Sequence, residues 1–139
     1  MNWAVDASLA AAFVLPDERS DTADAFFSAV EQGVRLWIPQ LWWIEMANTL
    51  LMASRRKRLS ADKILNSLSS LESLPLSEDD APCRSLGEVL TALAVKHRLT
   101  AYDAVYLELA QRRRIGLATL DKKLAAAARK ERIEVYGET

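Results

Sequence analysis

Short apolar runs alternate with longer helix-like segments along the whole of this 139-residue chain. Strands that are separated by helices cannot pair as hairpins, so they are expected to lie parallel in one sheet with helices on its two faces. The pattern therefore predicts an α/β fold, a small three-layer α/β/α sandwich around a small parallel sheet. The predicted strands are residues 2–6 (NWAVD), 34–38 (VRLWI), 73–76, 115–119 (IGLAT) and 133–137 (IEVYG).

Capping residues, glycine and proline set the predicted helix boundaries. The segment 20–32 begins at Ser20 or Asp21, whose side chains cap helix N-termini, and it ends at Gly33. The other predicted helices are a short one from about Ser8, then about 40–58, 60–74, 82–97, 101–113 and 121–131. We find no repeat, low-complexity stretch or linker, so residues 1–139 are expected to form a single domain.

The composition is that of a globular chain without a basic excess. Lysine and arginine together number 18, aspartate and glutamate number 19, and 50% of the residues are hydrophobic. A chain that binds nucleic acid through its overall charge would be distinctly basic, so any such binding here depends on local patches.

Cysteine usage and the N-terminal segment indicate the compartment. Cys83 is the only cysteine, which excludes an internal disulfide and favours a reducing environment. The apolar run 7–15 (ASLAAAFVL) resembles a signal-peptide core, but Asp6 stands where such a peptide carries positive charge. The run is also too short to span a bilayer. We therefore expect a cytoplasmic protein with no membrane segment.

Two aspartates follow predicted strands at the edge of the sheet where α/β folds bind ligands. Asp6 ends the first strand in VDAS, and Asp121 follows the IGLAT strand in ATLDKKL. Ligands of open parallel sheets bind beyond the carboxyl ends of the strands. Both aspartates also fit a structural role, because Asp6 or Ser8 is suited to cap the first helix and Asp121 to cap the last.

Two further carboxylates lie on predicted helices. Glu45 stands among apolar neighbours in PQLWWIEMANTLLM, where a carboxylate is unfavourable unless it is partly exposed, paired or bound to a metal. Asp103 follows Thr100 by three residues in LTAYDAVYLELA. This spacing is close to a capping box, so Asp103 either completes a helix cap or supplies a carboxylate for binding.

A cluster of these carboxylates would need a cation. Two carboxylates about 4 Å apart repel by roughly 4 kcal/mol at an effective dielectric near 20, whereas a helix cap contributes only about 1 kcal/mol. Because Mg²⁺ and Mn²⁺ prefer oxygen ligands, convergence would indicate a divalent cation site. Ser8 and Thr119 stand beside two of the aspartates, where they are suited equally to orienting ligands or water and to forming turns and caps.

Four motifs occur in one order over nearly the whole chain. They are VDAS, the P…E..N pattern of PQLWWIEMANTL, LTAYDAVYLELA and LATLDKKLAAAA. Together they resemble the PIN domain, and more narrowly the VapC-type toxins of bacterial and archaeal toxin–antitoxin pairs. The resemblance implies a PIN-like fold and a metal-dependent endoribonuclease that hydrolyses RNA. The acidic positions that match the family's Mg²⁺ or Mn²⁺ ligands are Asp6, Glu45, Asp103 and Asp121, with Ser8 and Thr119 as supporting hydroxyls.

The resemblance also implies partners. Similar toxins form homodimers and are blocked by a small antitoxin protein that covers the active site, and we expect it to dock on the apolar helix around Trp42 and Trp43. RNA phosphates require basic residues, and Lys122 and Lys123 beside Asp121 are the best placed. The remaining basic runs, at 55–58 and 112–114, are more typical of solvated helix faces.

Other assignments of the same residues are less suitable. A receiver-type signalling domain needs paired acidic residues after the first strand, where VDAS has one aspartate. A haloacid-dehalogenase-like phosphatase needs Asp-x-Asp there, and Ser8 occupies the second position. His97, the only histidine, lies in a basic helix end and is better suited to the helix dipole than to acid–base catalysis. A catalytically silent α/β binding or dimerisation module with the same fold remains the alternative.

Overall fold

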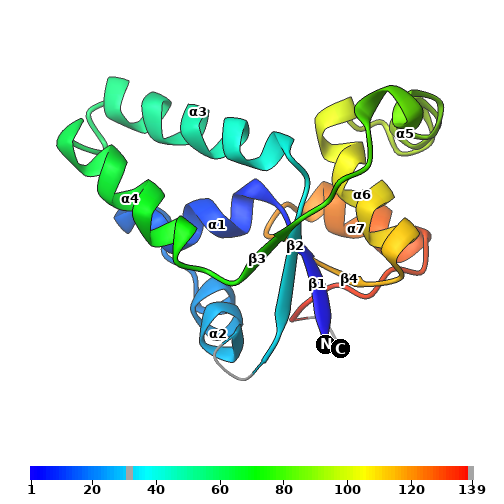
Figure 1. The fold of residues 1–139 in the computed structure, drawn as a ribbon, viewed down its shortest axis with the longest axis horizontal. Helices are drawn as coiled ribbons and strands as arrows, with labels where there is room; N and C mark the ends of the chain where they lie inside the picture. The colour runs from blue at the N-terminus through cyan, green and yellow to red at the C-terminus, as the bar shows by residue number, and fades with distance from the viewer. Residues whose placement is uncertain (31–32, 138–139) are drawn as a thin grey trace.

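The computed structural model describes residues 1–30 and 33–137, and within these residues it contains a four-stranded parallel sheet (Figure 1). The strands are β1 (Asn2–Val5), β2 (Arg35–Ile38), β3 (Leu76–Glu78) and β4 (Gly116–Ala118). Their order across the sheet is β3-β2-β1-β4, so β1 has a parallel neighbour on each side. Trp3 pairs with Leu36 of β2 and with Gly116 of β4, which fixes the register of these three strands.

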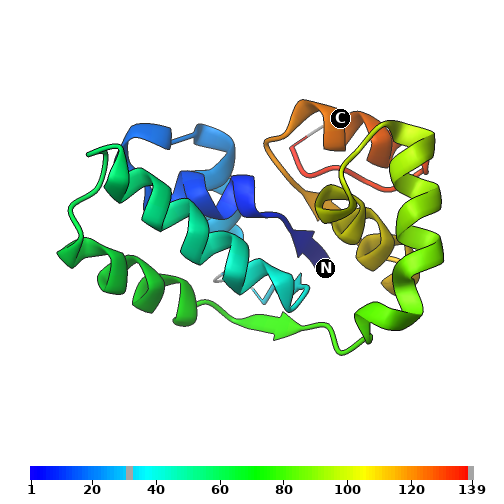
Figure 2. The same ribbon diagram turned by 90° about the horizontal axis from the view of Figure 1, so that it is seen from above.

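The helices form two groups on opposite sides of the sheet (Figures 1 and 2). They are α1 (Ala7–Val14), α2 (Asp21–Val30), α3 (Leu41–Arg55), α4 (Asp62–Glu72), α5 (Cys83–His97), α6 (Ala101–Arg113) and α7 (Lys122–Lys130), with a short 3-10 helix η1 (Pro16–Glu18) after α1. The chain runs outward from β1 to β3 and then returns past β1 to β4. Because crossovers between parallel strands are right-handed, α1–α4 cover one face, and α5 and α6 cover the other. The expected three-layer α/β/α arrangement is confirmed.

The two strands that carry Asp6 and Asp121 are buried on both faces. In β1, Trp3, Ala4 and Val5 are buried, and every residue of β4 is buried. Successive side chains of a strand point to opposite faces, so both helix layers cover these strands. Helix α6 packs against β1 and β4, and α1 packs against α2, α3 and α4. The carboxyl ends of β1 and β4 are therefore fixed by the core.

The predicted element boundaries need three corrections. Strand β3 begins at Leu76, after the predicted 73–76, because Pro75 has no N–H to donate to a neighbouring strand. The segment 133–137 is not a strand, since only Val135 forms a bridge, to Leu117, before Gly137 turns the chain with a φ of 83°. The helix predicted over 40–58 ends at Arg55. Elsewhere the predicted helices and strands are confirmed to within a few residues.

A buried ionic cluster ties the end of β3 to α6. Arg112 donates two hydrogen bonds to Asp79, at 2.5 and 3.0 Å, and two to Glu108, at 2.6 and 3.2 Å. Arg113 donates to Asp79 at 2.8 Å and lies over the ring of Trp37, 3.6 Å from its centroid. Burial alone would raise the pKa of Asp79, but these hydrogen bonds hold that pKa below its ordinary value. Two of the three arginines at 112–114 thus neutralise buried acids.

The tryptophans have mainly structural roles. Trp3 and Trp42 are buried in the core, while Trp37 and Trp43 are half-buried. The indole of Trp43 donates to Glu78 at 2.7 Å. Trp42 itself is fully buried and cannot contact a partner, so docking on the helix around Trp42 and Trp43 would use other residues of this helix.

The remaining sequence features also have structural explanations. His97 is buried and lies 2.7 Å from the carboxylate of Glu131, so it pairs with an acid beyond α7 as well as lying at the end of α5. Ser20 accepts a hydrogen bond from the N–H of Ala23 at 3.3 Å and therefore caps α2. No helix in the described part of the chain is both long and apolar enough to cross a membrane.

The close approach of β1 and β4 generates a stability prediction. A Cβ atom on Gly116 would overlap with Cζ3 and Cε3 of the buried Trp3 ring and would lie 3.2 Å from the carbonyl oxygen of Glu134. The ring is enclosed by the core and cannot move aside. Gly116→Ala is therefore expected to lower the free energy of unfolding by about 1–3 kcal/mol, measured by urea denaturation.

Gly87 supplies the matched control. It lies in α5, and a Cβ atom there would meet no atom within 4 Å. Gly87→Ala is expected to raise the free energy of unfolding by up to about 1 kcal/mol, because alanine is the better helix former. Equal effects of the two substitutions would contradict the packing described for Trp3.

Candidate functional site

The chain reverses its path across the sheet between β1 and β4. The chain leads from β1 to β2 and β3 on one side, and it then crosses back to form β4 on the other side of β1. The neighbouring strands β1 and β4 therefore form the topological switch point of the sheet. Ligands of open α/β sheets bind in the crevice at this point, beyond the carboxyl ends of the strands. Asp6 follows β1 directly, and Thr119 follows β4 directly. The sequence-predicted site residues thus begin at the expected place in the fold.

Two hydroxyl groups hold the Asp6 carboxylate across the two strand ends. Ser8 Oγ donates to both carboxylate oxygens, at 2.7 and 2.9 Å, and Thr119 Oγ1 donates to Oδ2. Ser8 Oγ in turn accepts the N–H of Leu120 at 3.0 Å, and Thr119 Oγ1 accepts the N–H of Asp121 at 3.0 Å. The two hydroxyls thus link the β4–α7 turn to the start of α1.

The carboxylate of Asp6 is buried without a cation. It also accepts the N–H of Leu9 at 3.1 Å, so the predicted capping of α1 is present. Burial raises the pKa of Asp6 to about 6 despite these hydrogen bonds, and the charge of Asp121 contributes to the increase. Within the described residues, the other buried carboxylates, Asp79 and Glu108, are both paired with arginine. Asp6 is therefore the buried acid whose charge is left uncompensated.

Glu45 reaches the site from the helix layer that also contains α1. It lies half-buried on α3, and its Oε1 accepts a hydrogen bond of 2.6 Å from the hydroxyl of Tyr106 on α6. Burial raises the pKa of Glu45; the Tyr106 hydrogen bond opposes the increase, and the charge of Asp103 adds to it. Glu45 therefore has another carboxylate nearby instead of a cation.

The carboxylate of Asp103 is not used for capping. Thr100 Oγ1 accepts the N–H of Asp103 at 3.1 Å, which is the first half of a capping box. The return hydrogen bond, from the N–H of Thr100 to the Asp103 carboxylate, is not formed within the described residues. Asp103 is half-buried one turn before Tyr106, on the side of α6 that faces Glu45. Its side chain is thus available for binding.

Asp121 combines a cap with a position in the crevice. Its Oδ1 accepts the N–H groups of Lys123 and Leu124, at 2.9 and 3.0 Å, which confirms the capping of α7. Its charge also acts on the buried Asp6. A helix N-terminus stabilises a carboxylate, so α7 supports the negative charge of Asp121.

Three of the four acids, Glu45, Asp6 and Asp103, lie near one buried tyrosine, but the four do not meet at one point. Tyr106 is 2% exposed, and its pKa is raised by burial and by the charges of Glu45, Asp6 and Asp103. Over residues 1–30 and 33–137, no three acidic, histidine or cysteine side chains are arranged to hold a metal ion directly. The donor chemistry nevertheless fits Mg²⁺ or Mn²⁺, because all four groups are carboxylates and none forms an ion pair in the described chain.

The lysines beside Asp121 are both exposed, but they differ in position. Lys122 lines a cavity of about 420 Å³ together with Thr119, Asp121 and Arg129. Lys122 and Arg129 are seven residues apart, so they share one face of α7. Lys123 does not line this cavity.

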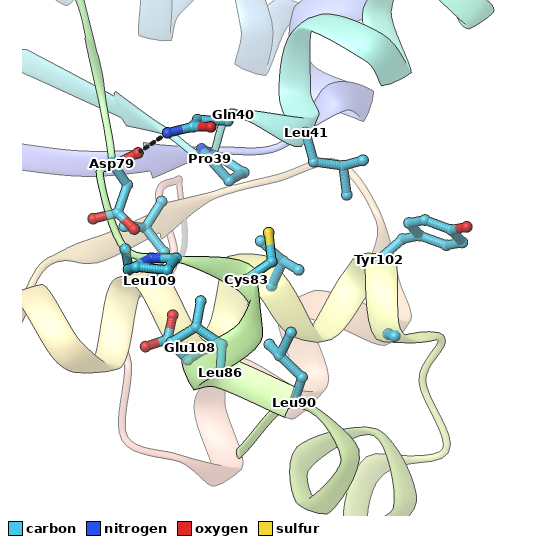
Figure 3. Close-up of a pocket in the computed structure, with 14 residues that line it drawn as sticks. Pro39, Gln40, Leu41, Asp79, Cys83, Leu86, Leu90, Tyr102, Glu108 and Leu109 are labelled. Carbon is cyan, nitrogen blue, oxygen red and sulfur yellow. Dashed lines mark hydrogen bonds between the residues drawn. The ribbon is translucent and has the colours of Figure 1, made fainter. Parts of the chain in front are cut away.

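A second depression contains acids but has different chemistry. This apolar groove, of about 310 Å³, is lined by residues that include Leu41, Leu86 and Leu90 (Figure 3). Asp79 and Glu108 lie at its margin, where arginines neutralise both carboxylates. Neutralised acids do not attract a metal ion, so the crevice at β1 and β4 remains the candidate site.

Tyr106 is the site residue that the sequence interpretation missed. It lies on the predicted helix 101–113, and the sequence alone gives its hydroxyl no partner. The available signal was its spacing, since residues three apart on a helix lie on the same face and Tyr106 follows Asp103 by three. A buried tyrosine hydroxyl also requires a hydrogen-bond partner.

The raised pKa of Asp6 generates a prediction for the protein in chelator. Between its ordinary pKa of 3.8 and about 6, the folded chain holds a proton on Asp6 that the unfolded chain has released. The contribution of Asp6 to the free energy of unfolding therefore falls as the pH rises through this range, by roughly 2–3 kcal/mol. Asparagine also caps helices. The stability of Asp6→Asn relative to the wild type should thus increase between about pH 4 and about pH 7 in urea denaturation. Parallel pH profiles would contradict the uncompensated burial of Asp6.

Known proteins are similar to this chain in sequence and in fold. Residues 4–130, a range that includes all four acids, match the PIN domain family. Ribonuclease VapC3 of Pyrobaculum aerophilum is 39% identical over 128 residues, which are 90% of this chain and 93% of the relative. The crystal structure of PAE2754 from Pyrobaculum aerophilum matches with a TM-score of 0.67 and 28% identity, over 91% of this chain and 79% of that one. FitAcB from Neisseria gonorrhoeae shares the fold, with a TM-score of 0.64 and 17% identity over 99% and 97% of the two chains. The family match and the identity to VapC3 together establish that this protein belongs to the PIN-domain family.

Proposed function

We propose that this chain is a Mg²⁺- or Mn²⁺-dependent endoribonuclease that hydrolyses RNA phosphodiester bonds, and that it is the toxin of a toxin–antitoxin module. The observation that carries the proposal is the buried Asp6 carboxylate, which has no cation although two other buried acids of the same fold are paired with arginine. The relative named Ribonuclease VapC3 supports the reaction class. Membership of the PIN-domain family supports the place of the site in the fold.

The proposed metal ligands are the four carboxylates Asp6, Glu45, Asp103 and Asp121. A bound divalent cation supplies an activated water and positive charge for the phosphodiester that is attacked. Ser8 and Thr119 orient the Asp6 carboxylate by hydrogen bonds to its oxygens. The N-terminus of α7 stabilises the charge of Asp121. The protein's own groups thus hold the acids ready for a cation that replaces their mutual repulsion with attraction.

The proposed partners are RNA, a small antitoxin protein and a second copy of the chain. Helix α3 remains the proposed docking element for the antitoxin, but its exposed apolar residues are Ile44, 69% exposed, and Leu51, 42% exposed. These residues are seven apart and share one face of the helix. Ile44 precedes the candidate ligand Glu45, so a segment bound to this face would approach the site. A cytoplasmic location belongs to the same proposal, because it provides RNA and keeps Cys83 reduced.

A silent binding or dimerisation module of the same fold is the second candidate. It is favoured only by the observation that, within the described residues, the acids are not arranged around one point where a metal ion could bind directly. Such a module has no reason to leave a buried carboxylate uncompensated, since an arginine at this place would stabilise it as it does Asp79. The nuclease is therefore the better supported function.

Cleavage assays test the nuclease directly. Wild type, Asp6→Asn and Glu45→Gln are purified identically and incubated with mixed RNA in Mg²⁺, in Mn²⁺ and in chelator. The wild type should cleave RNA only with metal, and each variant should lose about 100-fold of the rate, which corresponds to ~2.7 kcal/mol of barrier. Equal cleavage by all three proteins would indicate a contaminating nuclease.

Thermal melting separates the nuclease from the silent module without an activity measurement. Mn²⁺ at about 100 times its dissociation constant should stabilise the wild type by ~2.7 kcal/mol and should stabilise both variants less. Absence of cleavage, together with absence of a metal-induced rise in melting temperature, would support the silent module.

The two lysines of α7 give a prediction for RNA binding. Lys122→Ala should weaken binding of a single-stranded RNA and reduce the slope of log affinity against log salt by about 0.7, the loss of one phosphate contact. Lys123→Ala should have a smaller effect, because Lys123 does not line the cavity beside Asp121. Lys63→Ala on α4, in the other helix layer, is the matched control. An effect of Lys63→Ala equal to that of Lys122→Ala would exclude a localised contact.

A further inference from the structure

One hydrogen bond joins the two helix layers at the candidate site. The hydroxyl of Tyr106 on α6 donates to Oε1 of Glu45 on α3, at 2.6 Å, across 61 positions of sequence. Helices α3 and α6 lie on opposite sides of the sheet (Figures 1 and 2). Hydrogen bonds to a charged acceptor are shorter and stronger than those between neutral groups. The bond therefore fixes the distance between the two layers at the level of the acids.

Glu45 is the acid that most needs such a bond. Asp6 and Asp121 are held by neighbouring hydroxyl and N–H groups, and each lies at the end of a buried strand. Glu45 lies within a helix and has a longer side chain, whose rotamers must be restricted for binding. It is half-buried, so without a partner its carboxylate would turn toward water.

The geometry leaves the second oxygen of Glu45 available. Oε1 accepts the Tyr106 proton, and Oε2 forms no hydrogen bond within residues 1–30 and 33–137. The Tyr106 side chain is buried and cannot follow Glu45 if that residue turns outward. One carboxylate oxygen is thus held by the protein, and the other is free to face the remaining acids.

We propose that Tyr106 is a positioning residue of the site: its hydroxyl holds Oε1 of Glu45, so that Oε2 is presented to a divalent cation shared with the other three acids. This inference rests on the proposed function, since it assigns Tyr106 to the same metal site. It gives Tyr106 no contact with the metal or with RNA.

Mn²⁺ binding to the metal-free protein tests this inference without using cleavage. Electron paramagnetic resonance of free Mn²⁺ gives the dissociation constant of each variant, and melting in chelator shows that each is folded. Tyr106→Phe removes one oxygen and keeps the ring, and it should weaken Mn²⁺ binding about tenfold. In a Glu45→Gln background the same substitution should change affinity less than about twofold, because the carboxylate that it positions is already lost.

Tyr102→Phe is the matched control, because it makes the same chemical change four residues earlier on α6. Tyr102 is 59% exposed, so its substitution should leave Mn²⁺ affinity unchanged. Glu45→Asp provides a second test that leaves the core intact. It keeps the charge but shortens the side chain away from the Tyr106 hydroxyl, and it should also weaken binding about tenfold.

The possible results distinguish this inference from the proposed function. If Glu45→Gln weakens Mn²⁺ binding while Tyr106→Phe does not, the role of Tyr106 is overturned and the metal site stands. The role is also overturned if Tyr106→Phe weakens binding equally in both backgrounds, or if Glu45→Asp binds as tightly as the wild type. If the wild type binds no Mn²⁺, both the metal site and the role of Tyr106 are overturned.

Discussion

The carboxylate of Asp6, held between Ser8 and Thr119, is the interaction on which the candidate site depends. The hydrogen bond between Thr119 and Asp6 connects residues 113 positions apart in the sequence. It is possible only because β4 returns to lie beside β1, so that the carboxyl ends of the first and last strands meet. The same contacts cap α1 and order the turn that leads to Asp121 and α7. These hydrogen bonds therefore join the ends of β1 and β4 at the candidate site.

The buried acids of this protein have two different kinds of hydrogen-bond partner. Asp79 and Glu108 are paired with Arg112, and this cluster fastens β3 to α6. Asp6 receives hydroxyl and N–H donors but no cation, although an ion pair would be the more stable arrangement. Stability alone does not explain this difference between neighbouring parts of one fold. A site that must accept a cation from outside explains it, since an arginine there would compete with that cation.

The sequence was sufficient for the architecture and for half of the site. Alternating strands and helices dictate a parallel sheet, and strand ends place Asp6, Thr119 and Asp121 at one edge without further information. The segment 133–137 was misread, because the strand that it joins is only three residues long and allows a single bridge. The pairing of Arg112 and Arg113 was also beyond the sequence, because their acidic partner Asp79 lies on a distant segment that only the tertiary fold brings close. The role of Tyr106 was missed because the partner of its hydroxyl, Glu45, lies on a distant segment that only the tertiary fold brings close.

At the proposed site, four acids of two helix layers share a divalent cation beyond the ends of β1 and β4. Anomalous X-ray scattering from crystals grown with Mn²⁺ locates such an ion directly. We predict a Mn²⁺ peak in this crevice, with oxygens of Asp6 and of at least one further member of the four within about 2.5 Å or joined through bound water. A fully occupied Mn²⁺ elsewhere, with none at this crevice, would contradict it.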